Sequence, residues 1–271
     1  GLYDELERIS GQSCGLHQSG GVIFADNQDR WDWCKMAHAR ARYLNLDTEL
    51  LTPSEAKKLF PLVEEKYFVG ALWDKADGNL NPEDTTQAYA KSAQIGGAEI
   101  VLQNRVVDLK PRTDGTWDVV TEKGTIHAEH VVNAGGLWAR EVGHLVGLEL
   151  PVLAMEHHYI VTEPLPELAG LEREIINTTD FSGEIYLRQE GKGVLLGTYE
   201  QACVPWSPQT TPDGFHSQLL PESIERISPE LERGFTHFPA LARAGIKKTV
   251  NGPFTFSPDG NPLVGPVQGL P

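Results

Sequence analysis

The stretch VVNAGGLWAREVGHLVGLELPVLAMEHHYIVT, residues 131–162, says more about the fold than any other part of the chain. An apolar segment leads through the small residues of NAGG (133–136) into a helical pattern, and a long strand pattern follows. Small residues at such a junction let a ligand approach the backbone, and the helix N-terminus offers unpaired N–H groups. A plain tight turn would use the same residues. No glycine-rich phosphate loop precedes the stretch, although a nucleotide-binding unit normally opens with one.

The long strand at the end of this stretch carries two adjacent histidines. Alternation along a strand places His157 on a mostly apolar face, together with Leu153, Met155, Tyr159 and Val161. We therefore expect His157 on a largely buried surface, either as a core histidine bonded to a neighbour or as part of a site. His158 points to the opposite face, so the pair cannot ligate one ion together, and we predict no metal site.

Composition limits the class of protein. The chain has 271 residues, 40% of them hydrophobic and 23% charged, which is typical of one large or two modest globular domains. The net charge is −15 without clustered Lys or Arg, which excludes nucleic acid as the expected partner. No apolar run approaches the roughly 20 residues of a membrane span, so we expect no membrane association. The three cysteines form no C-x-x-C pattern, which favours a reducing compartment over zinc or disulfides.

Outward from the stretch, helical patterns dominate the first hundred residues and short strands dominate the rest. Asp26 or Asn27 can cap a helix, Thr52 to Glu55 forms a capping box, and Asn81 starts a helix that Gly96 ends. The apolar face expected for the first of these helices comprises Trp33, Met36, Ala37, Ala41 and Leu44. Strands are expected at 20–25, 98–103, 105–112, 117–122, 124–128, 129–134, 152–162, 184–189, 194–200 and 248–254, and a late helix over 215–227. The pattern predicts an α+β (mixed) fold.

Two later segments could take part in a site. In EIYLRQ (184–189), Tyr186 and Arg188 share one strand face, and arginine is a good bidentate clamp for a carboxylate. A solvated arginine beside an edge aromatic fits the same pattern. SPDGNPLVGP (257–266) predicts an irregular loop of limited freedom.

Taken together, the segments NAGGLWAREVG, H-x-Y-x-V-T, YLRQE and NGPFTFSPDGNPLVGP closely resemble the dimethylglycine and sarcosine dehydrogenase family. These are FAD-dependent amine oxidoreductases of the D-amino-acid-oxidase-like group. The resemblance covers essentially the whole chain. It implies a large mixed or antiparallel substrate-domain sheet with flanking helices, plus a partial FAD-binding domain.

The resemblance also implies roles for individual residues. His157 and Tyr186 would be the catalytic pair that lines the substrate pocket, and Val106 would contact FAD through its backbone. The other expected FAD neighbours are Ala134, Gly135, Trp138, Asp259, Gly260 and Pro262. Strand geometry adds Arg188 as the carboxylate clamp and Tyr159 as a second substrate-binding residue.

The domains implied are a substrate domain, residues 1–81 and 148–250, and a partial FAD domain, residues 82–147 and 251–271. The G-x-G-x-x-G unit that binds the FAD pyrophosphate in the family is absent from the sequence. We therefore expect a central fragment that does not hold FAD by itself and is inactive alone.

The implied activity is oxidative demethylation of an N-methyl amino acid by hydride transfer to flavin. Tetrahydrofolate bound by a downstream domain, an electron-acceptor flavoprotein and self-association are the further partners this suggests. The expected location is the bacterial cytoplasm, or the mitochondrial matrix in a eukaryote. Two alternatives stay open. One is a stand-alone binding or interaction module derived from such an enzyme. The other is a related flavoenzyme acting on another amino acid or on glycerol 3-phosphate.

Overall fold

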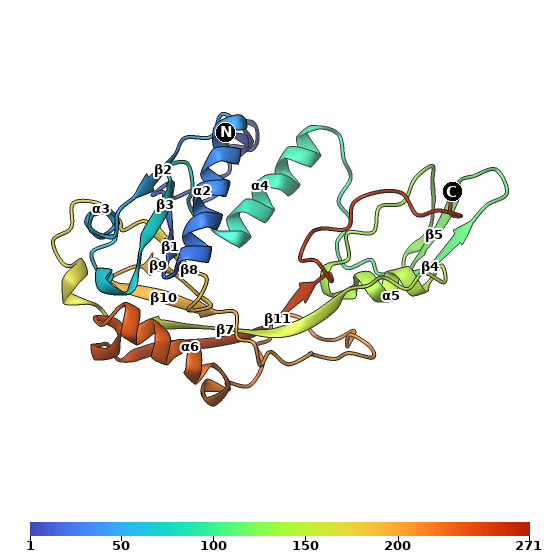
Figure 1. Cartoon of the computed structure of the whole chain (residues 1–271). Coiled ribbons are helices and arrows are strands. Elements are labelled where there is room, and N and C mark those ends of the chain that lie inside the picture. The colour runs from blue at the N-terminus through green and yellow to red at the C-terminus, as the bar shows by residue number, and fades with distance from the viewer. The chain divides into compact units, whose positions relative to one another are not determined.

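A computed structural model describes residues 1–271, which form two compact units. Unit 1 comprises Gly1–Glu99, His158–Ala202 and Pro221–Val250, and unit 2 comprises Ile100–His157, Cys203–Leu220 and Asn251–Pro271. An eight-stranded mixed sheet, a three-stranded antiparallel sheet and six α-helices confirm the predicted mixed class (Figure 1). None of the helices is both long and apolar enough to cross a membrane.

The eight-stranded sheet has the order β11-β7-β10-β9-β8-β1-β3-β2. Its strand β1 pairs parallel with β8 and antiparallel with β3, so the sheet is mixed. The division between the units falls within β7, after His157, and within β11, after Val250. The strands are β1 (Gly21–Ala25), β2 (Thr48–Leu51), β3 (Gly70–Asp74), β7 (Leu153–Thr162), β8 (Asn177–Asp180), β9 (Ile185–Glu190), β10 (Gly193–Thr198) and β11 (Ile246–Phe256).

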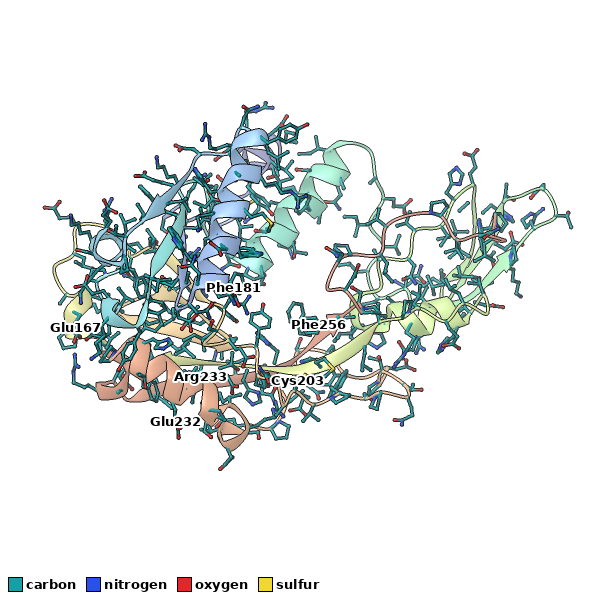
Figure 2. The ribbon with its side chains drawn as sticks, in the orientation of Figure 1. Glu167, Phe181, Cys203, Glu232, Arg233 and Phe256 are labelled. Atoms are coloured by element: carbon teal, nitrogen blue, oxygen red, sulfur yellow. The ribbon has the colours of Figure 1, made fainter.

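One face of this sheet carries the main core of unit 1. Helix α6 (Ile224–His237) lies on it and buries Ile227, Leu231 and Gly234, at the spacing of one helical stripe. Gly234 allows the close approach, because a Cβ there would stand 3.1 Å from the methyl carbons of Ile185 and Leu196. Along the outer side of the same helix, Glu232 is exposed (Figure 2). Beyond the helix end, Phe238 is fully buried among the rings of Phe24, Phe60 and Phe68.

Helix α2 (Gln28–Tyr43) lies on the opposite face, over β1, β2 and β3. Asn27 caps it as predicted, and its Oδ1 accepts the N–H of Arg30 at 2.9 Å. The predicted apolar face was wrong in part: Trp33, Met36 and Leu44 are exposed, Met36 to 60%. Ala41 is buried as predicted, and Cys34, which was not assigned to that face, is buried as well. Trp31 belongs to the buried side because its ring fills the space above Gly70, where a Cβ would approach it to 2.6 Å.

The remaining helices of unit 1 follow their local signals. In α3 (Pro53–Leu59) the capping box of Thr52 and Glu55 is present, as predicted. Asn81 caps α4 (Pro82–Ile95), which ends at Gly96, and α4 packs against α1 (Leu2–Ser10). The predicted helix over 215–227 was wrong at both ends, because the helix begins only at Ile224 and continues to His237. Before it, the N–H of Leu220 is bonded to the carbonyl of Asn251.

Unit 2 contains the antiparallel sheet β4-β5-β6 (Val106–Pro111, Trp117–Thr121, Gly124–Ala128). The predicted turn at Asp114 and Gly115 joins β4 to β5, with Gly115 at a positive φ of 85°. The strands predicted over 98–103 and 129–134 are absent, and Leu102 and Val132 there are 76% and 86% exposed. A strand needs a neighbour to bond its backbone, and no strand of the described chain pairs with either segment.

Candidate functional site

The side of the sheet opposite α6 carries a row of residues that lie level with one another. Register aligns Tyr159 of β7 with Gly197 of β10, Gly197 with Tyr186 of β9, and Tyr186 with Thr179 of β8. The same row continues through Ile23, Leu72 and Leu50, which lie under α2. Helix α2 thus packs on the β1-β3-β2 half of this side. We call the other half, with Tyr159, Tyr186, Arg188 and Tyr199, the tyrosine face.

Tyr186 lies flat on the sheet because its neighbour is a glycine. A Cβ at Gly197 would stand only 2.0 Å from Cζ of Tyr186, so the ring occupies the space of the missing side chain. The ring centroid of Tyr186 is 5.6 Å from that of Tyr199, at an interplanar angle of 50°. A residue larger than glycine at position 197 would displace the tyrosine ring.

Burial raises the pKa of two of these phenols. Burial, together with the nearby hydroxyls of Tyr199 and Tyr159, raises the pKa of Tyr186 to about 12, while Arg188 acts in the opposite direction. Burial also raises the pKa of Tyr199. An ordinary tyrosine is already neutral in the physiological pH range, and these shifts keep both side chains neutral hydrogen-bond donors to a higher pH.

Arg188 lies on the same side of β9 as Tyr186. Its Nη1 is 2.8 Å from Oε2 of Glu190, and both side chains are partly exposed. A guanidinium has five N–H donors, so this ion pair leaves donors for a ligand carboxylate.

The structure corrects the prediction for the two histidines of β7. Alternation is as expected, but the fully buried histidine is His158 and not His157. His158 faces α6, where Nη2 of Arg226 lies 2.8 Å from its Nδ1, and Nε of Arg226 lies 3.2 Å from Oε1 of the buried Glu200. Periodicity shows that neighbours alternate, but the packing of α6 decides which face is buried.

His157, at the end of the unit 2 part of β7, is half-buried. Its ring centroid is 5.5 Å from that of Phe254, in an edge-on arrangement, and Phe254 in turn contacts Phe256. His157 thus joins a small aromatic cluster of unit 2, and its proposed catalytic role remains a prediction.

The NAGG turn of unit 2 is held by its own asparagine. Asn133 Oδ1 accepts the N–H of Gly135 at 3.1 Å, and its amide donates to the carbonyl of Ala139 at 2.8 Å. The turn leads into the 3-10 helix η2 (Gly136–Trp138) and then α5 (Ala139–His144). Asn133 is the residue that fixes the turn, a role that the sequence interpretation did not assign.

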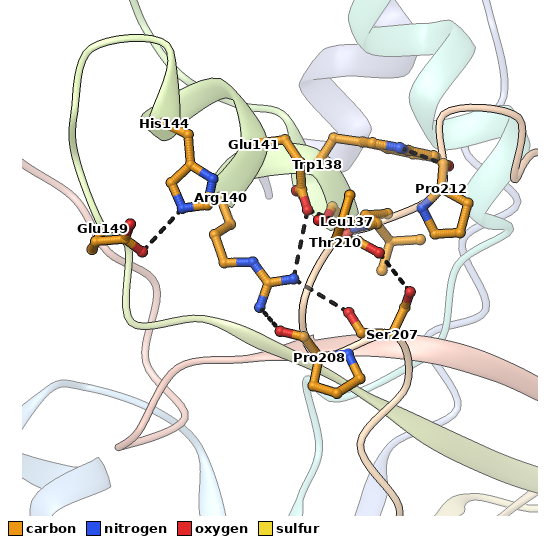
Figure 3. Close-up of polar contacts among 11 residues, drawn as sticks. Leu137, Trp138, Arg140, Glu141, His144, Glu149, Ser207, Pro208, Thr210 and Pro212 are labelled. Atoms are coloured by element: carbon orange, nitrogen blue, oxygen red, sulfur yellow. Dashed lines mark hydrogen bonds and ion pairs between the residues drawn. The ribbon is translucent and has the colours of Figure 1, made fainter.

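The proline-rich loop after Cys203 fastens this region (Figure 3). Trp138 donates its ring N–H to the carbonyl of Pro212 at 3.2 Å, and Arg140 donates to the carbonyl of Pro208 at 2.7 Å. The N–H of Thr211 donates to the carboxylate of Glu141 at 2.6 Å. The indole of Trp138 is thereby fixed in place, with its N–H already bonded within the protein.

The NAGG turn and the start of β4 present backbone groups that a ligand could approach. Ala134 is exposed and Gly135 is half-buried, so the small residues leave the backbone open to a ligand, and the first N–H groups of η2 follow. Val106 begins β4 beside a register shift between Val106 and Asp108. These residues could hold the cofactor through backbone groups.

The loop SPDGNPLVG is exposed and ordered by local bonds. Asn261, by its side chain and its N–H, and then the hydroxyl of Ser257 hold the pKa of Asp259 below its usual value. Gly260 has a positive φ of 73°, which forms the turn, and Pro262 is exposed after it. Asp259 therefore shapes its own loop, and a role toward FAD remains a prediction for all three residues.

The structure brings Tyr159, Tyr186 and Arg188 together in unit 1, while His157 and the expected FAD neighbours belong to unit 2. The sequence interpretation missed Tyr199 and Gly197. Alternation along β10 places Gly197 and Tyr199 on the same side of the sheet as Tyr159 and Tyr186. The sequence alone does not show this, because a glycine within a strand has no side chain to pack, and its importance appears only when its partner is known.

Comparison with known proteins gives the family. The model of the FAD dependent oxidoreductase family matches residues 1–270. The chain belongs to this family. It is 39% identical to mitochondrial dimethylglycine dehydrogenase of Mus musculus, over 99% of this chain and 32% of that relative. It is 31% identical to mitochondrial sarcosine dehydrogenase of Mus musculus, over 98% of this chain and 29% of that relative.

Among solved structures, L-proline dehydrogenase from P. horikoshii shares the fold, with a TM-score of 0.81 at 24% identity, over 99% of this chain and 68% of that one. The predicted resemblance to the dimethylglycine and sarcosine dehydrogenases is confirmed at the level of the family. The chain spans about a third of the length of these two relatives, 32% and 29%.

Proposed function

We propose that the complete gene product oxidises N-methyl amino acids of the dimethylglycine and sarcosine type, with FAD as electron acceptor. The observation that carries the proposal is the tyrosine face, where two aligned tyrosines and Arg188 lie on one side of a sheet. Family membership and the similarity to two dehydrogenases named for these amines support it.

Bound FAD would supply the acceptor for a hydride from the N-methyl carbon. The amine needs its lone pair for this step, so its ammonium proton must first pass to solvent. The guanidinium of Arg188 would bind the substrate carboxylate, and the neutral hydroxyl of Tyr186 would orient the substrate without adding charge. The iminium product would then add water and release formaldehyde and the demethylated amine, or would pass its one-carbon unit to tetrahydrofolate.

The roles of the other residues are part of the proposal. His157 would touch the substrate, and Tyr159 would bind it. Backbone groups of Val106, Ala134 and Gly135, the ring of Trp138 and the loop Asp259–Gly260–Pro262 would hold FAD. Residues 1–81 and 148–250 would form the substrate domain, and residues 82–147 and 251–271 part of the FAD domain.

Flavin reduction tests the proposal directly. Anaerobic addition of dimethylglycine or sarcosine to the FAD-loaded complete gene product should bleach the flavin absorption. The variant His157→Ala should be reduced more slowly, whereas His17→Ala, at an exposed histidine bonded to Glu174, should match the parent protein. If neither amine bleaches the flavin, the substrate assignment fails. Equal rates for His157→Ala and the parent would exclude His157 from the site.

A further inference from the structure

We propose that Tyr199 completes a cation site with Tyr159 and Tyr186, and that this site receives the methylated ammonium group of the substrate. The inference rests on the proposed function and adds the determinant of substrate choice. Tyr199 would be a specificity-determining residue that favours tertiary and secondary methylated amines over primary amines.

The first observation is the placement of the three rings. Tyr159 and Tyr186 flank Gly197 from the two strands beside β10, so their backbones start about 10 Å apart at the usual strand spacing. Tyr186 leans over Gly197, toward the β7 side, because its ring fills the space of the absent side chain. Tyr199 contacts the ring of Tyr186 at 5.6 Å and 50°. Three rings from β7, β9 and the end of β10 thus gather on one face.

The second observation fixes Tyr199 in this position. Its N–H donates to the carbonyl of Glu184 at 2.8 Å, which extends the β9–β10 pairing past Thr198. The preceding Thr198 is fully buried, and the following Glu200 is buried against Arg226, so the backbone on both sides of Tyr199 is anchored. The residue is 52% exposed and can meet a ligand.

The chemistry selects a methylated ammonium. A cation over the face of a tyrosine ring is attracted by the ring quadrupole, and cages of aromatic rings recognise quaternary and methylated ammonium groups. A methylated ammonium has few N–H donors and loses little hydration in such a cage. A primary ammonium has three donors that the ring faces do not satisfy. Arg188, two residues from Tyr186 on the same side of β9, supplies the charge for the carboxylate end.

The binding test uses a pair of ligands that differ in charge and hardly in shape. Glycine betaine carries a trimethylammonium group, and 3,3-dimethylbutanoate replaces its nitrogen by carbon. By titration calorimetry on the FAD-loaded complete gene product, betaine should bind about 2- to 30-fold more tightly than its carbon analogue. The variant Tyr199→Ala should lose most of this ratio, Tyr199→Phe should keep it, and Tyr43→Ala, at an 85% exposed tyrosine of α2, should not change it.

A second readout separates a cage from a merely structural role. A cage that stabilises the cation raises the pKa of the bound amine, so the pH at which flavin reduction by dimethylglycine reaches half its limit should fall in Tyr199→Ala. The expected fall is about 0.4 to 1.5 pH units, which is the same 2- to 30-fold change.

The proposed cation site is refuted if betaine and its carbon analogue bind equally tightly. It is also refuted if the ratio of their affinities is unchanged in Tyr199→Ala. If betaine is preferred through Tyr199 but no methylated amino acid reduces the flavin, the cage stands and the proposed oxidation fails. If dimethylglycine reduces the flavin at an unchanged rate and pH profile in Tyr199→Ala, the oxidation stands and the cage fails.

Discussion

The buried ion pair of Arg226 and Glu200 allows a sharp test of the packing of unit 1. Arg226 is mostly buried and donates from Nε to Glu200 at 3.2 Å, while its Nη2 lies 2.8 Å from the ring of the fully buried His158. In the variant Arg226→Met the stem of the side chain is retained and the charge is lost. The carboxylate of Glu200 then stays buried and still accepts a hydrogen bond from the hydroxyl of Thr198 at 3.0 Å, but it loses the bond from the guanidinium.

Removing one partner of a buried ion pair typically costs about 3–5 kcal/mol, because the other charge is left uncompensated. An exposed pair is worth about 0–1 kcal/mol, so Arg243→Met, which breaks the exposed pair with Glu167, is the matched control. Urea unfolding followed by tryptophan fluorescence should show the larger loss for Arg226→Met. The double variant Arg226→Met with Glu200→Gln should recover part of it, since neither partner of the pair then carries a charge.

The slope of unfolding free energy against urea must be equal in the variants for this comparison to measure stability. A loss for Arg226→Met within 1 kcal/mol of that for Arg243→Met, which is about the worth of an exposed pair, would refute the view that Glu200 depends on this arginine.

Three further outcomes follow from burial and charge. Burial raises the pKa of Cys34 to about 11, Cys14 is also buried, and Cys203 is exposed. At pH 8 an aromatic disulfide reagent should therefore react quickly with one thiol of the native chain, and Cys203→Ser should abolish that fast phase. Two fast-reacting thiols would contradict the burial of Cys14 and Cys34. Because the pKa of Tyr186 is raised to about 12, the native state loses stability as the pH rises from about 10 to 12, and Tyr186→Phe should remove the latest step of the 295 nm titration. Tyr43→Phe should leave that step in place. Burial, with the charges of Glu184 and Glu200, raises the pKa of Glu230, so its ionisation destabilises the native state as the pH rises. At pH 8 the variant Glu230→Gln should therefore have a higher melting temperature than the parent protein. This difference should vanish as the pH falls toward 4.5. A lower melting temperature of Glu230→Gln at pH 8 would show that the ion pair with Arg233 stabilises the native state by more than the burial of the charge destabilises it.

Sequence signals that act over a few residues were reliable. The caps at Asn27, Thr52 and Asn81 were predicted because each side chain bonds an N–H two or three residues away, whatever the rest of the fold does. The family was also accessible, since its motifs are spread over the whole chain.

Features set by distant neighbours could not be predicted in this way. The buried face of α2 depends on Trp31 filling the space above Gly70, and the choice of His158 as the buried histidine depends on α6. The segments 98–103 and 129–134 have strand composition, but a strand exists only where another backbone accepts its hydrogen bonds. Tyr199 was missed for the same reason, because its partner Tyr186 lies on another strand.

The alternation of β7 has a consequence for how related proteins can diverge. His158 lies toward α6 while Tyr159 lies on the tyrosine face, and each loses its surroundings if the strand shifts by one residue. A single insertion or deletion within the strand would exchange the two sides at every position beyond it. The loops of this fold can therefore change length one residue at a time, whereas β7 can be lengthened or shortened only in steps of two.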